Sequence, residues 1–482
     1  MSDEMCLFCS KAQCFNKLSA MPDTKVKTPP RLPLGRLIQT MKNVFPTLTI
    51  APQRFPDMLV TGLPGIRTVY MVNNPDMAQY VLQKNYRNFP KAKGYEVLAL
   101  LLGKGLVTNE GDNWHKQRTL IQPAFHRETL RRISEITVTS TNNLLSRWKE
   151  KEGTTINFTR EMAEVTIDIV AKSLFTTDVT PDHIQTIWRN VNYLNESAEA
   201  LLRNPFHLPI WVPTPGHLKM KRYIAELDDI VYNIINRRKL EKDPSPDLLQ
   251  LLLEARYDDG TGMSDLQIRD EVMTIFMAGH ETTVNALSWT WYLLKQNKPE
   301  EEKLREESVR YAGPRDPAFV DMPALVYGRH VMNESMRIYP PVPVVGRQVR
   351  ETDVVGGYQV KAGNDLAVNI AGIHHHPAYW KDPFKFQPER FANFDLKGDN
   401  RFVFLPFGGG PRICIGNNFA MMEMQLINAV LSARVDMDLI SLDVRPNALI
   451  TLKPENGVVM RLNKVADLIP VDTLIGETIE HV

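Results

Sequence analysis

The long stretch without proline between Asp265 and Pro299 constrains the fold of this chain more than any other feature. Ser264 and Gln267 stand at its start with the spacing of a capping box, in which each side chain satisfies a free backbone amide. If the segment is helical to Gln296, it contains 32 residues and measures about 48 Å at 1.5 Å per residue. A helix of that length crosses a whole domain, so the remaining elements must pack around it.

The middle of this predicted helix changes abruptly from apolar to polar residues, in the order Ile275-Phe276-Met277-Ala278-Gly279-His280-Glu281-Thr282-Thr283. A glutamate buried in such a helix needs a partner or a function. A glycine inside a helix costs about 1 kcal/mol relative to alanine. Departures of this kind from local helix rules are typical of functional sites, so we predict a site on this helix.

The composition is that of an ordinary globular protein and argues against two broad classes. The 482 residues include 57 Lys and Arg against 56 Asp and Glu, which gives a net charge of +1, and 43% of the residues are hydrophobic. These values exclude wholesale disorder. The near-zero charge argues against a nucleic-acid partner, because electrostatic capture of nucleic acid needs a strongly basic surface.

Four cysteines, Cys6, Cys9, Cys14 and Cys414, are too few for a disulfide framework in so large a chain and favour a reducing compartment. The first twenty residues lack the basic and then apolar layout of a signal peptide. The apolar stretches all fall short of the roughly 18 residues that suggest a transmembrane anchor. We therefore expect a soluble, cytoplasmic protein.

Residues 1–25 are expected to form a flexible N-terminal tail, because they show no sustained hydrophobic period. A zinc or cluster site usually needs four ligands, and only three cysteines lie in this tail, so we do not assign it a metal. A stiff proline-rich run, residues 28–35, then leads into the folded body. We predict one domain over residues 26–482, mainly α with small β-sheets, an α+β fold.

Short runs rich in β-branched and aromatic residues predict the strands. Residues 68–72 and 344–349 are two such runs. Residues 449–452 and 458–462 are separated by Pro454-Glu455-Asn456-Gly457, a spacing that predicts a β-hairpin near the C-terminus.

The segment from Phe407 to Gly416 carries the sharpest chemical signal in the chain. It reads Phe407-Gly408-Gly409-Gly410-Pro411-Arg412-Ile413-Cys414-Ile415-Gly416, and a helical pattern follows it. The glycines permit tight turns and a close backbone approach to a flat ligand. A cysteine at a helix N-terminus is biased towards the thiolate, and Arg412 adds positive charge. The thiolate of Cys414 could be a nucleophile or a metal ligand.

This segment resembles the haem-ligand loop of the cytochrome P450 superfamily, the haem-thiolate monooxygenases. The signature positions of that loop are matched by Phe407, Gly408, Gly410, Arg412, Cys414 and Gly416. The family's other motifs follow in the expected order as Trp114-His115-Lys116-Gln117-Arg118, Ala278-Gly279-His280-Glu281-Thr282-Thr283, Glu334-Ser335-Met336-Arg337 and Pro388-Glu389-Arg390-Phe391. The resemblance covers residue 28 to the C-terminus. It implies a triangular, helix-rich single domain with the haem between a long central helix and the cysteine loop.

The resemblance also implies roles for the residues that match the motifs. Cys414 would be the axial ligand of the haem iron, and its electron donation favours O–O cleavage. Phe407 and Gly408 would contact the haem and tune the sulfur. Gly279, beside Ala278, would let the helix bulge and open a groove for dioxygen.

On the same helix, the resemblance assigns Glu281 and Thr282 to proton delivery, for which an acid and an alcohol are chemically suited. A back-bond from Thr282 to its own helix is compatible with that role. We expect His280 to serve packing or hydrogen bonding instead of catalysis.

Two further sets of residues are implied to support the haem. Arginine suits the propionates because it donates paired, charge-assisted hydrogen bonds to carboxylates. The propionate set comprises Trp114, Arg118, Arg347 and Arg412; Lys91 and Lys93 lie in too loose a motif to be assigned. Glu334, Arg337 and Arg390 resemble a buried structural triad. His374-His375-His376 departs from the family pattern, and we expect a solvated loop there in preference to a metal site.

The resemblance implies an enzyme with haem b that inserts one atom of O2 into a lipophilic substrate. The His-Glu-Thr-Thr form of the central helix favours hydroxylation of a fatty acid; a terpenoid or natural-product hydroxylase or epoxidase is the alternative. A peroxygenase or isomerase is disfavoured, because such branches tend to lose the pair formed by Glu281 and Thr282. A haem sensor or carrier without turnover is the alternative of another class.

The electrons for this chemistry are expected to come from a separate donor, a ferredoxin or flavodoxin with its reductase. Only twenty residues follow Leu462, too few for a flavin domain. Positive charge for an acidic donor is offered by His115, Lys116, Arg131 and Arg132, which could equally be solvated residues of basic helices.

Overall fold

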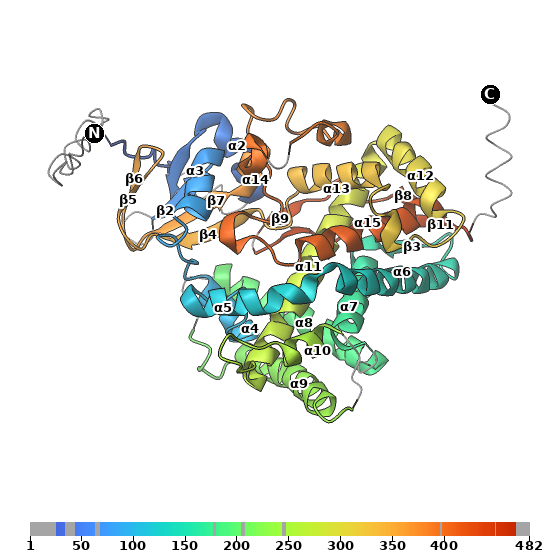
Figure 1. Cartoon of the computed structure of the whole chain (residues 1–482). Coiled ribbons are helices and arrows are strands. Elements are labelled where there is room, and N and C mark those ends of the chain that lie inside the picture. The colour runs from blue at the N-terminus through green and yellow to red at the C-terminus, as the bar shows by residue number, and fades with distance from the viewer. Residues whose placement is uncertain are drawn as a thin grey trace, which may run out of the picture.

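The long helix α11 (Asp265–Gln296) runs through the middle of the computed structural model, so the predicted helix is confirmed at both ends (Figure 1). The Ser264 side chain caps it by accepting the backbone N–H of Gln267 at 3.2 Å. The structure describes residues 26–33, 44–62, 68–176, 180–203, 208–242, 247–395, 398–448 and 450–468. The predicted tail at residues 1–25, with its three cysteines, lies outside these ranges.

Together with α11, the other α-helices make up about half of the described chain. They are α2 (Val44–Arg54), α3 (Pro75–Gln79), α4 (Tyr95–Leu102), α5 (Gly111–Ile121), α6 (Arg127–Lys149), α7 (Phe158–Phe175), α8 (Pro181–Arg203), α9 (Pro215–Arg238), α10 (Leu248–Glu254), α12 (Lys298–Ala312), α13 (Val326–Ile338), α14 (Ile370–His374) and α15 (Asn417–Arg434). Figure 1 shows the molecule tapering from α12 and α13 at the top to α9 at the bottom, in keeping with the expected triangular outline.

The strands form small separate sheets at the edges of the helical body. A four-stranded sheet has the order β1 (Met58–Thr61), β2 (Val69–Val72), β7 (Asp365–Asn369) and β4 (Val344–Gln348), with β2 and β7 parallel. A three-stranded sheet has the order β3 (Thr155–Asn157), β11 (Val459–Val465) and β8 (Val435–Leu439). The remaining pairs are β5 (Asp353–Val355) with β6 (Tyr358–Val360), and β9 (Pro446–Ala448) with β10 (Leu452–Pro454).

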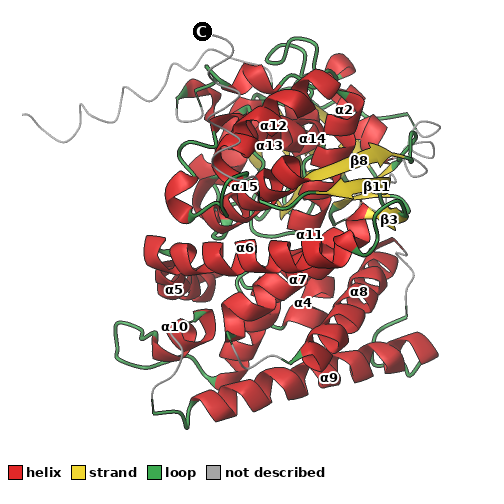
Figure 2. Cartoon of the chain, turned by 90° about the vertical axis from the view of Figure 1, so that its right-hand side faces the viewer, coloured by secondary structure: helices red, strands yellow, loops and turns green. Residues whose placement is uncertain are grey.

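These sheets confirm the predicted fold class, mainly α with small β-sheets, and the strands expected at 68–72 and 344–349. Figure 2 shows the strands of the three-stranded sheet on one side of the upper half, while helices fill the lower half. Among the described helices, none has both the length and the apolarity needed to cross a membrane.

The hairpin predicted near the C-terminus is wrong. A turn does form at Asn456 and Gly457, which both have positive φ, but its two arms join different sheets. β10 pairs with β9, and β11 pairs with β3 and β8. The apolar face of β11, with Met460 and Leu462 fully buried, packs on the main core beside α6 and α7, and this long-range burial outweighs local pairing.

Nearly the whole circumference of α11 is buried, which explains its mixture of apolar and polar residues. Phe276 packs on Phe175 of α7 with a ring separation of 6.0 Å. His280 is 2% exposed, and its Nδ1 lies 2.8 Å from the Thr166 hydroxyl of α7. This contact confirms that His280 serves hydrogen bonding within the core.

The predicted triad is also confirmed, and it holds the segments that lead to the cysteine loop. Arg337 donates to both carboxylate oxygens of Glu334, at 2.7 and 2.9 Å, and Arg390 donates to Glu334 at 3.0 Å. Arg337 also donates to the carbonyl of His374 at 2.9 Å. The His374 Nε2 accepts the backbone N–H of Leu405 at 2.7 Å.

The solvated loop expected for the three consecutive histidines is therefore wrong. His374, His375 and His376 are 0%, 1% and 5% exposed, because their rings bond to the backbone of neighbouring segments. Within the described residues, no cluster of three or more His, Cys, Asp or Glu side chains could hold a metal ion. The three histidines therefore have a structural role: His374 bonds to Leu405 and His376 to Pro56, which are both distant in sequence.

Burial of His280 predicts a pH dependence of stability. Its folded-state pKa is lowered to about 4 by burial, against about 6.5 in the unfolded chain. Between these values the unfolded chain binds the proton and the folded chain does not, so the free energy of unfolding decreases as the pH falls. We expect His280→Asn to remove about 3 kcal/mol of this decrease, measured by urea unfolding at several pH values. An unchanged pH slope, equal to that of the exposed-site control His115→Asn, would contradict this.

Candidate active site

The cysteine loop is shaped by its own backbone hydrogen bonds. The N–H of Cys414 donates to the carbonyl of Phe407 at 3.0 Å, which folds the segment back on itself. Gly408 has φ +74°, a left-handed conformation that favours glycine. α15 begins three residues after Cys414, at Asn417, so the cysteine precedes a helix as predicted.

Gly410 is required for a second reason, which the sequence pattern alone does not reveal. Its φ is +70°, and a Cβ built on it would lie 1.9 Å from the carbonyl oxygen of Leu82. Leu82 belongs to a π-helical turn, Tyr80–Lys84. The cysteine loop therefore packs backbone to backbone against this turn, and only glycine fits.

A cavity of about 330 Å³ lies between the cysteine loop and α11. The loop side is lined by Phe407, Gly408, Arg412 and Cys414. The α11 side is lined by Ala278, Gly279, Thr282 and Thr283. Segments more than 100 residues apart thus meet at one cavity, as the motifs predicted.

The thiol of Cys414 does not show the predicted bias towards thiolate. It is exposed to the cavity, and desolvation by the surrounding protein raises its pKa. The backbone N–H of Gly416 and the charge of Arg118 lower the pKa, but they do not outweigh desolvation. In the protein without a bound metal, desolvation by the apolar walls therefore opposes the effect of the helix terminus.

Cationic side chains gather at one end of the cavity, from elements far apart in the chain. Arg118 on α5, Arg347 on β4 and Arg412 in the loop all line it, and so does Trp114. The Arg118 and Arg412 guanidinium groups lie 5.8 and 5.5 Å from the Trp114 ring centre. The Nε atoms of Arg347 and Arg412 are buried without a hydrogen-bond partner among the described residues. Both nitrogens can donate to an anion.

Lys91 joins this cationic group, although its motif was too loose to assign from the sequence. Its Nζ donates to the backbone carbonyls of Leu106 and Asn109, and it also lies 5.8 Å from the Trp114 ring centre. Burial lowers the pKa of Lys91 to about 7. Glu110 is the acid of the group and forms an ion pair with Arg412. The cationic side chains outnumber it, so the group retains capacity for a further anion.

Thr282 and Thr283 behave differently on α11. Thr282 lines the cavity, and its hydroxyl donates to the carbonyl of Ala278 at 2.8 Å, the back-bond expected for it. The Thr283 hydroxyl donates to the carbonyl of Gly279 at 2.9 Å and lies 3.4 Å from a carboxylate oxygen of Glu423 on α15. Burial raises the pKa of Glu423 far above its usual range. α11 is α-helical throughout, so the bulge expected at Gly279 does not form.

Glu281 does not line the cavity. Its carboxylate accepts the Thr451 hydroxyl at 2.7 Å and pairs with Lys453 at 2.7 Å. Lys453 also pairs with Glu199 of α8 at 2.9 Å. The expected partnership of Glu281 with Thr282 is therefore not formed in this structure, because long-range ion pairs hold the carboxylate on another face of α11.

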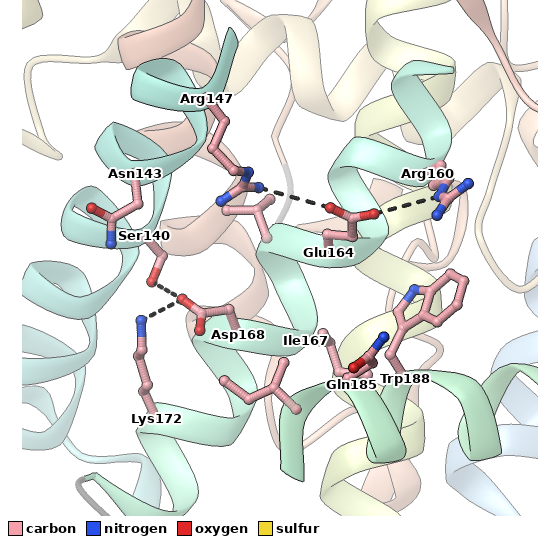
Figure 3. Close-up of a pocket in the computed structure, with 12 residues that line it drawn as sticks. Ser140, Asn143, Arg147, Arg160, Glu164, Ile167, Asp168, Lys172, Gln185 and Trp188 are labelled. Atoms are coloured by element: carbon pink, nitrogen blue, oxygen red, sulfur yellow. Dashed lines mark hydrogen bonds and ion pairs between the residues drawn. The ribbon is translucent and has the colours of Figure 1, made fainter. Parts of the chain in front are cut away.

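A second hollow, of about 420 Å³, lies between α6, α7 and α8 (Figure 3). Its charged groups pair with one another: Asp168 accepts from Ser140 and Lys172, both at 2.6 Å, and Glu164 lies 3.4 Å from Arg160 and 3.9 Å from Arg147. Because these charges are paired within the hollow, we do not assign it a ligand.

The residues present fit the haem that the sequence resemblance implies. Cys414 offers sulfur to an iron, and a bound metal would stabilise the thiolate that the protein alone does not. The unpartnered Nε atoms of Arg347 and Arg412, with Arg118 and Lys91, would meet two propionates. Apolar residues make up most of the remaining wall.

Comparison with known proteins gives the same assignment. The sequence model of the cytochrome P450 family matches residues 27–461. The chain is 31% identical to putative cytochrome P450 132 of Mycobacterium tuberculosis over 81% of this chain and 87% of that protein. It is 32% identical to cyclooctatin synthase of Streptomyces melanosporofaciens, over 77% of this chain and 81% of that protein.

A third relative, cyclooctat-9-en-7-ol 5-monooxygenase of Streptomyces melanosporofaciens, is 30% identical over 80% of this chain and 86% of that protein. The family match spans most of the chain, and residues of three of the family's motifs, among them Trp114, Thr282 and Cys414, line one cavity. This chain belongs to the cytochrome P450 family, a family of haem-thiolate monooxygenases.

Proposed function

We propose that this protein binds haem b and inserts one atom of O2 into a C–H bond of a lipophilic substrate. One observation carries the proposal: the thiol of Cys414 and the hydroxyl of Thr282 face a single cavity that is also lined by cationic side chains. When bound, the haem would supply the activation of O2. The protein would supply the thiolate, the charges for the propionates and the walls that exclude water.

Thr282 is the residue best placed to hold a proton at the reacting centre. Its hydroxyl hydrogen is directed to the carbonyl of Ala278, which leaves the oxygen lone pairs free to accept from a water or ligand in the cavity. Glu281 can reach the cavity only after it leaves Thr451 and Lys453. We therefore assign proton handling to Thr282. Glu281 would take part only in a conformation in which its carboxylate has left Thr451 and Lys453.

For the substrate we propose a terpenoid or a similarly bulky, hydrocarbon-rich molecule. The cavity walls are mostly apolar, which suits such a substrate. The name of one relative, cyclooctat-9-en-7-ol 5-monooxygenase, describes oxygenation of an unsaturated alcohol. A fatty acid, which the His-Glu-Thr-Thr sequence favoured, stays a competing prediction.

Optical titration of the ferric protein tests the substrate class. A substrate that displaces water from the iron changes its spin state, so terpenoids and fatty acids can be compared by the size and midpoint of the absorbance shift. We expect a saturable shift with terpenoids at concentrations where fatty acids give none. The reverse order would favour the fatty-acid prediction, and Cys414→Ser, which removes the thiolate, should abolish the normal spectrum in either case.

The role of Thr282 predicts a change in coupling. In Thr282→Ala the cavity loses its hydroxyl, so reductant should be consumed with several-fold less product and with release of hydrogen peroxide. Thr290→Ala is a matched control, because the Thr290 hydroxyl makes the same bond to its own helix, at 2.7 Å to Ala286, but lies outside the cavity lining. Equal coupling in the two variants would refute the assignment to Thr282.

We further propose a separate acidic electron donor, of the ferredoxin or flavodoxin type. His115, Lys116 and Arg131 are exposed on α5 and α6. α5 carries Arg118, which lines the cavity, and α6 packs on α15, which follows the cysteine loop. A positive surface here would attract a negative donor.

Charge reversal tests this surface. Lys116→Glu should slow reduction by an acidic donor several-fold at low salt and should weaken the dependence of the rate on ionic strength. Lys361→Glu, which reverses an exposed lysine between β6 and β7, should leave the rate unchanged. Equal effects of the two substitutions would mean that the donor binds elsewhere.

A further inference from the structure

Three buried polar atoms that line the cavity lack hydrogen-bond partners among the described residues. They are Oε1 of Glu271, Oγ1 of Thr274 and Oγ of Ser173, each without a hydrogen-bond partner in the described part of the chain. The three residues are 1%, 4% and 3% exposed, and all three line the cavity that contains Cys414 and Thr282. Glu271 and Thr274 are three residues apart on α11, so they share a face, and Ser173 comes from α7.

The position of this group is fixed by the loop that precedes α5. The second carboxylate oxygen of Glu271, Oε2, accepts the backbone N–H of Leu106 at 2.9 Å. A Cβ built on Gly105 would lie 2.0 Å from the Thr274 hydroxyl, so the loop backbone approaches α11 as closely as glycine allows. With Oε2 held by the loop, Oε1 is the oxygen that is left for a ligand.

Leaving these atoms unpaired is costly. A buried polar group without a partner destabilises the folded protein, and a buried charged group without a partner does so more strongly. Most buried polar atoms in proteins form hydrogen bonds for this reason. Three buried polar atoms without hydrogen-bond partners in one cavity therefore point to a ligand that bonds to them. None of the three atoms has a role in the proton handling assigned to Thr282.

The charges and hydrogen-bonding groups around Glu271, Thr274 and Ser173 indicate which functional group of a ligand would bind there. A carboxylate is disfavoured because it would face the Glu271 carboxyl with like charge. An ammonium is disfavoured because Lys91, Arg118 and Arg347 line the same cavity. A hydroxyl both donates and accepts, which matches one carboxylate oxygen beside two hydroxyls.

We propose that the substrate is a lipophilic alcohol whose hydroxyl donates to Oε1 of Glu271 and accepts hydrogen bonds from the hydroxyls of Thr274 and Ser173. Glu271 precedes Gly279 by eight residues, or about 12 Å along the helix axis. The hydroxyl is thus anchored roughly that far along α11 from the place of oxidation. This inference rests on the proposed function and specifies its substrate class.

The proposed hydrogen bond to Glu271, here called the anchor, can be tested without knowledge of the natural substrate. The probes needed are molecules that bind the haem iron directly. We would titrate the haem-loaded protein with ω-(imidazol-1-yl)alkan-1-ols of increasing chain length and with their methyl ethers. Imidazole ligates the iron, and the far end of the chain samples the wall. At one chain length the alcohol should bind about tenfold more tightly than its ether, the size expected for a hydrogen bond to a charged group.

Glu271→Gln should remove this preference while keeping the shape of the side chain. The amide oxygen must accept the N–H of Leu106, so the amide NH2 faces the cavity and the acceptor becomes a donor. Ser173→Ala should reduce the preference in the same direction. Ser308→Ala is the matched control, since Ser308 is equally buried and unpartnered but does not line the cavity.

The outcomes separate this inference from the proposed function. If the alcohols and ethers bind equally at every chain length, or if Glu271→Gln leaves the preference intact, the anchor is refuted and the wall serves another purpose, such as a water network to the propionates. If the protein binds no haem, or the imidazole group does not ligate it, the proposed function and the anchor both fail.

Discussion

The fully buried carboxylate of Glu334 is the contact on which the placement of the site depends. It accepts from Arg337, Arg390 and the backbone N–H of Gln387, so one charge ties α13 to the later segment that contains Gln387 and Arg390. Arg337 continues this linkage to the carbonyl of His374, whose ring accepts the N–H of Leu405. The chain reaches Phe407 two residues later. A continuous polar path therefore runs from α13 to the loop that presents Cys414, and each bond in it lies where water cannot compete.

The cavity is electrostatically incomplete in the protein alone. On its proximal side, burial opposes ionisation of Cys414, and cationic side chains outnumber the Glu110 carboxylate. A group that brings a metal ion to the sulfur and carboxylates to the arginines would correct both imbalances. Beside Lys91, which shares Leu106 as a hydrogen-bond partner, Glu271 has the reverse imbalance, since burial raises its pKa to about 7 and one of its oxygens has no described partner. We propose that haem corrects the first imbalance and that the hydroxyl of the substrate corrects the second.

Predictions from the sequence agree with the structure where the interactions are between residues close together in the chain. The ends of α11, the strands at 69–72 and 344–348 and the helix after Cys414 are set by local signals such as the Ser264 cap, and these predictions are confirmed. The family and the enzyme class, which rest on motifs in register, are confirmed as well. The hairpin prediction failed because β11 gains more by burying its apolar face against the main core than by pairing with a nearby strand.

The sequence by itself determined the identity of the chemical groups: the thiol of Cys414, the hydroxyl of Thr282, and the arginines at positions 118, 347 and 412. Only the tertiary structure decided what those groups face. Glu281 and Thr282 are adjacent in the chain, yet Lys453 and Thr451 hold Glu281 away from the cavity. Glu271 carried no motif, yet the loop at Leu106 leaves one of its oxygens on the cavity wall. Desolvation and ion pairing depend on neighbours brought together from across the chain, and no local pattern of residues encodes them.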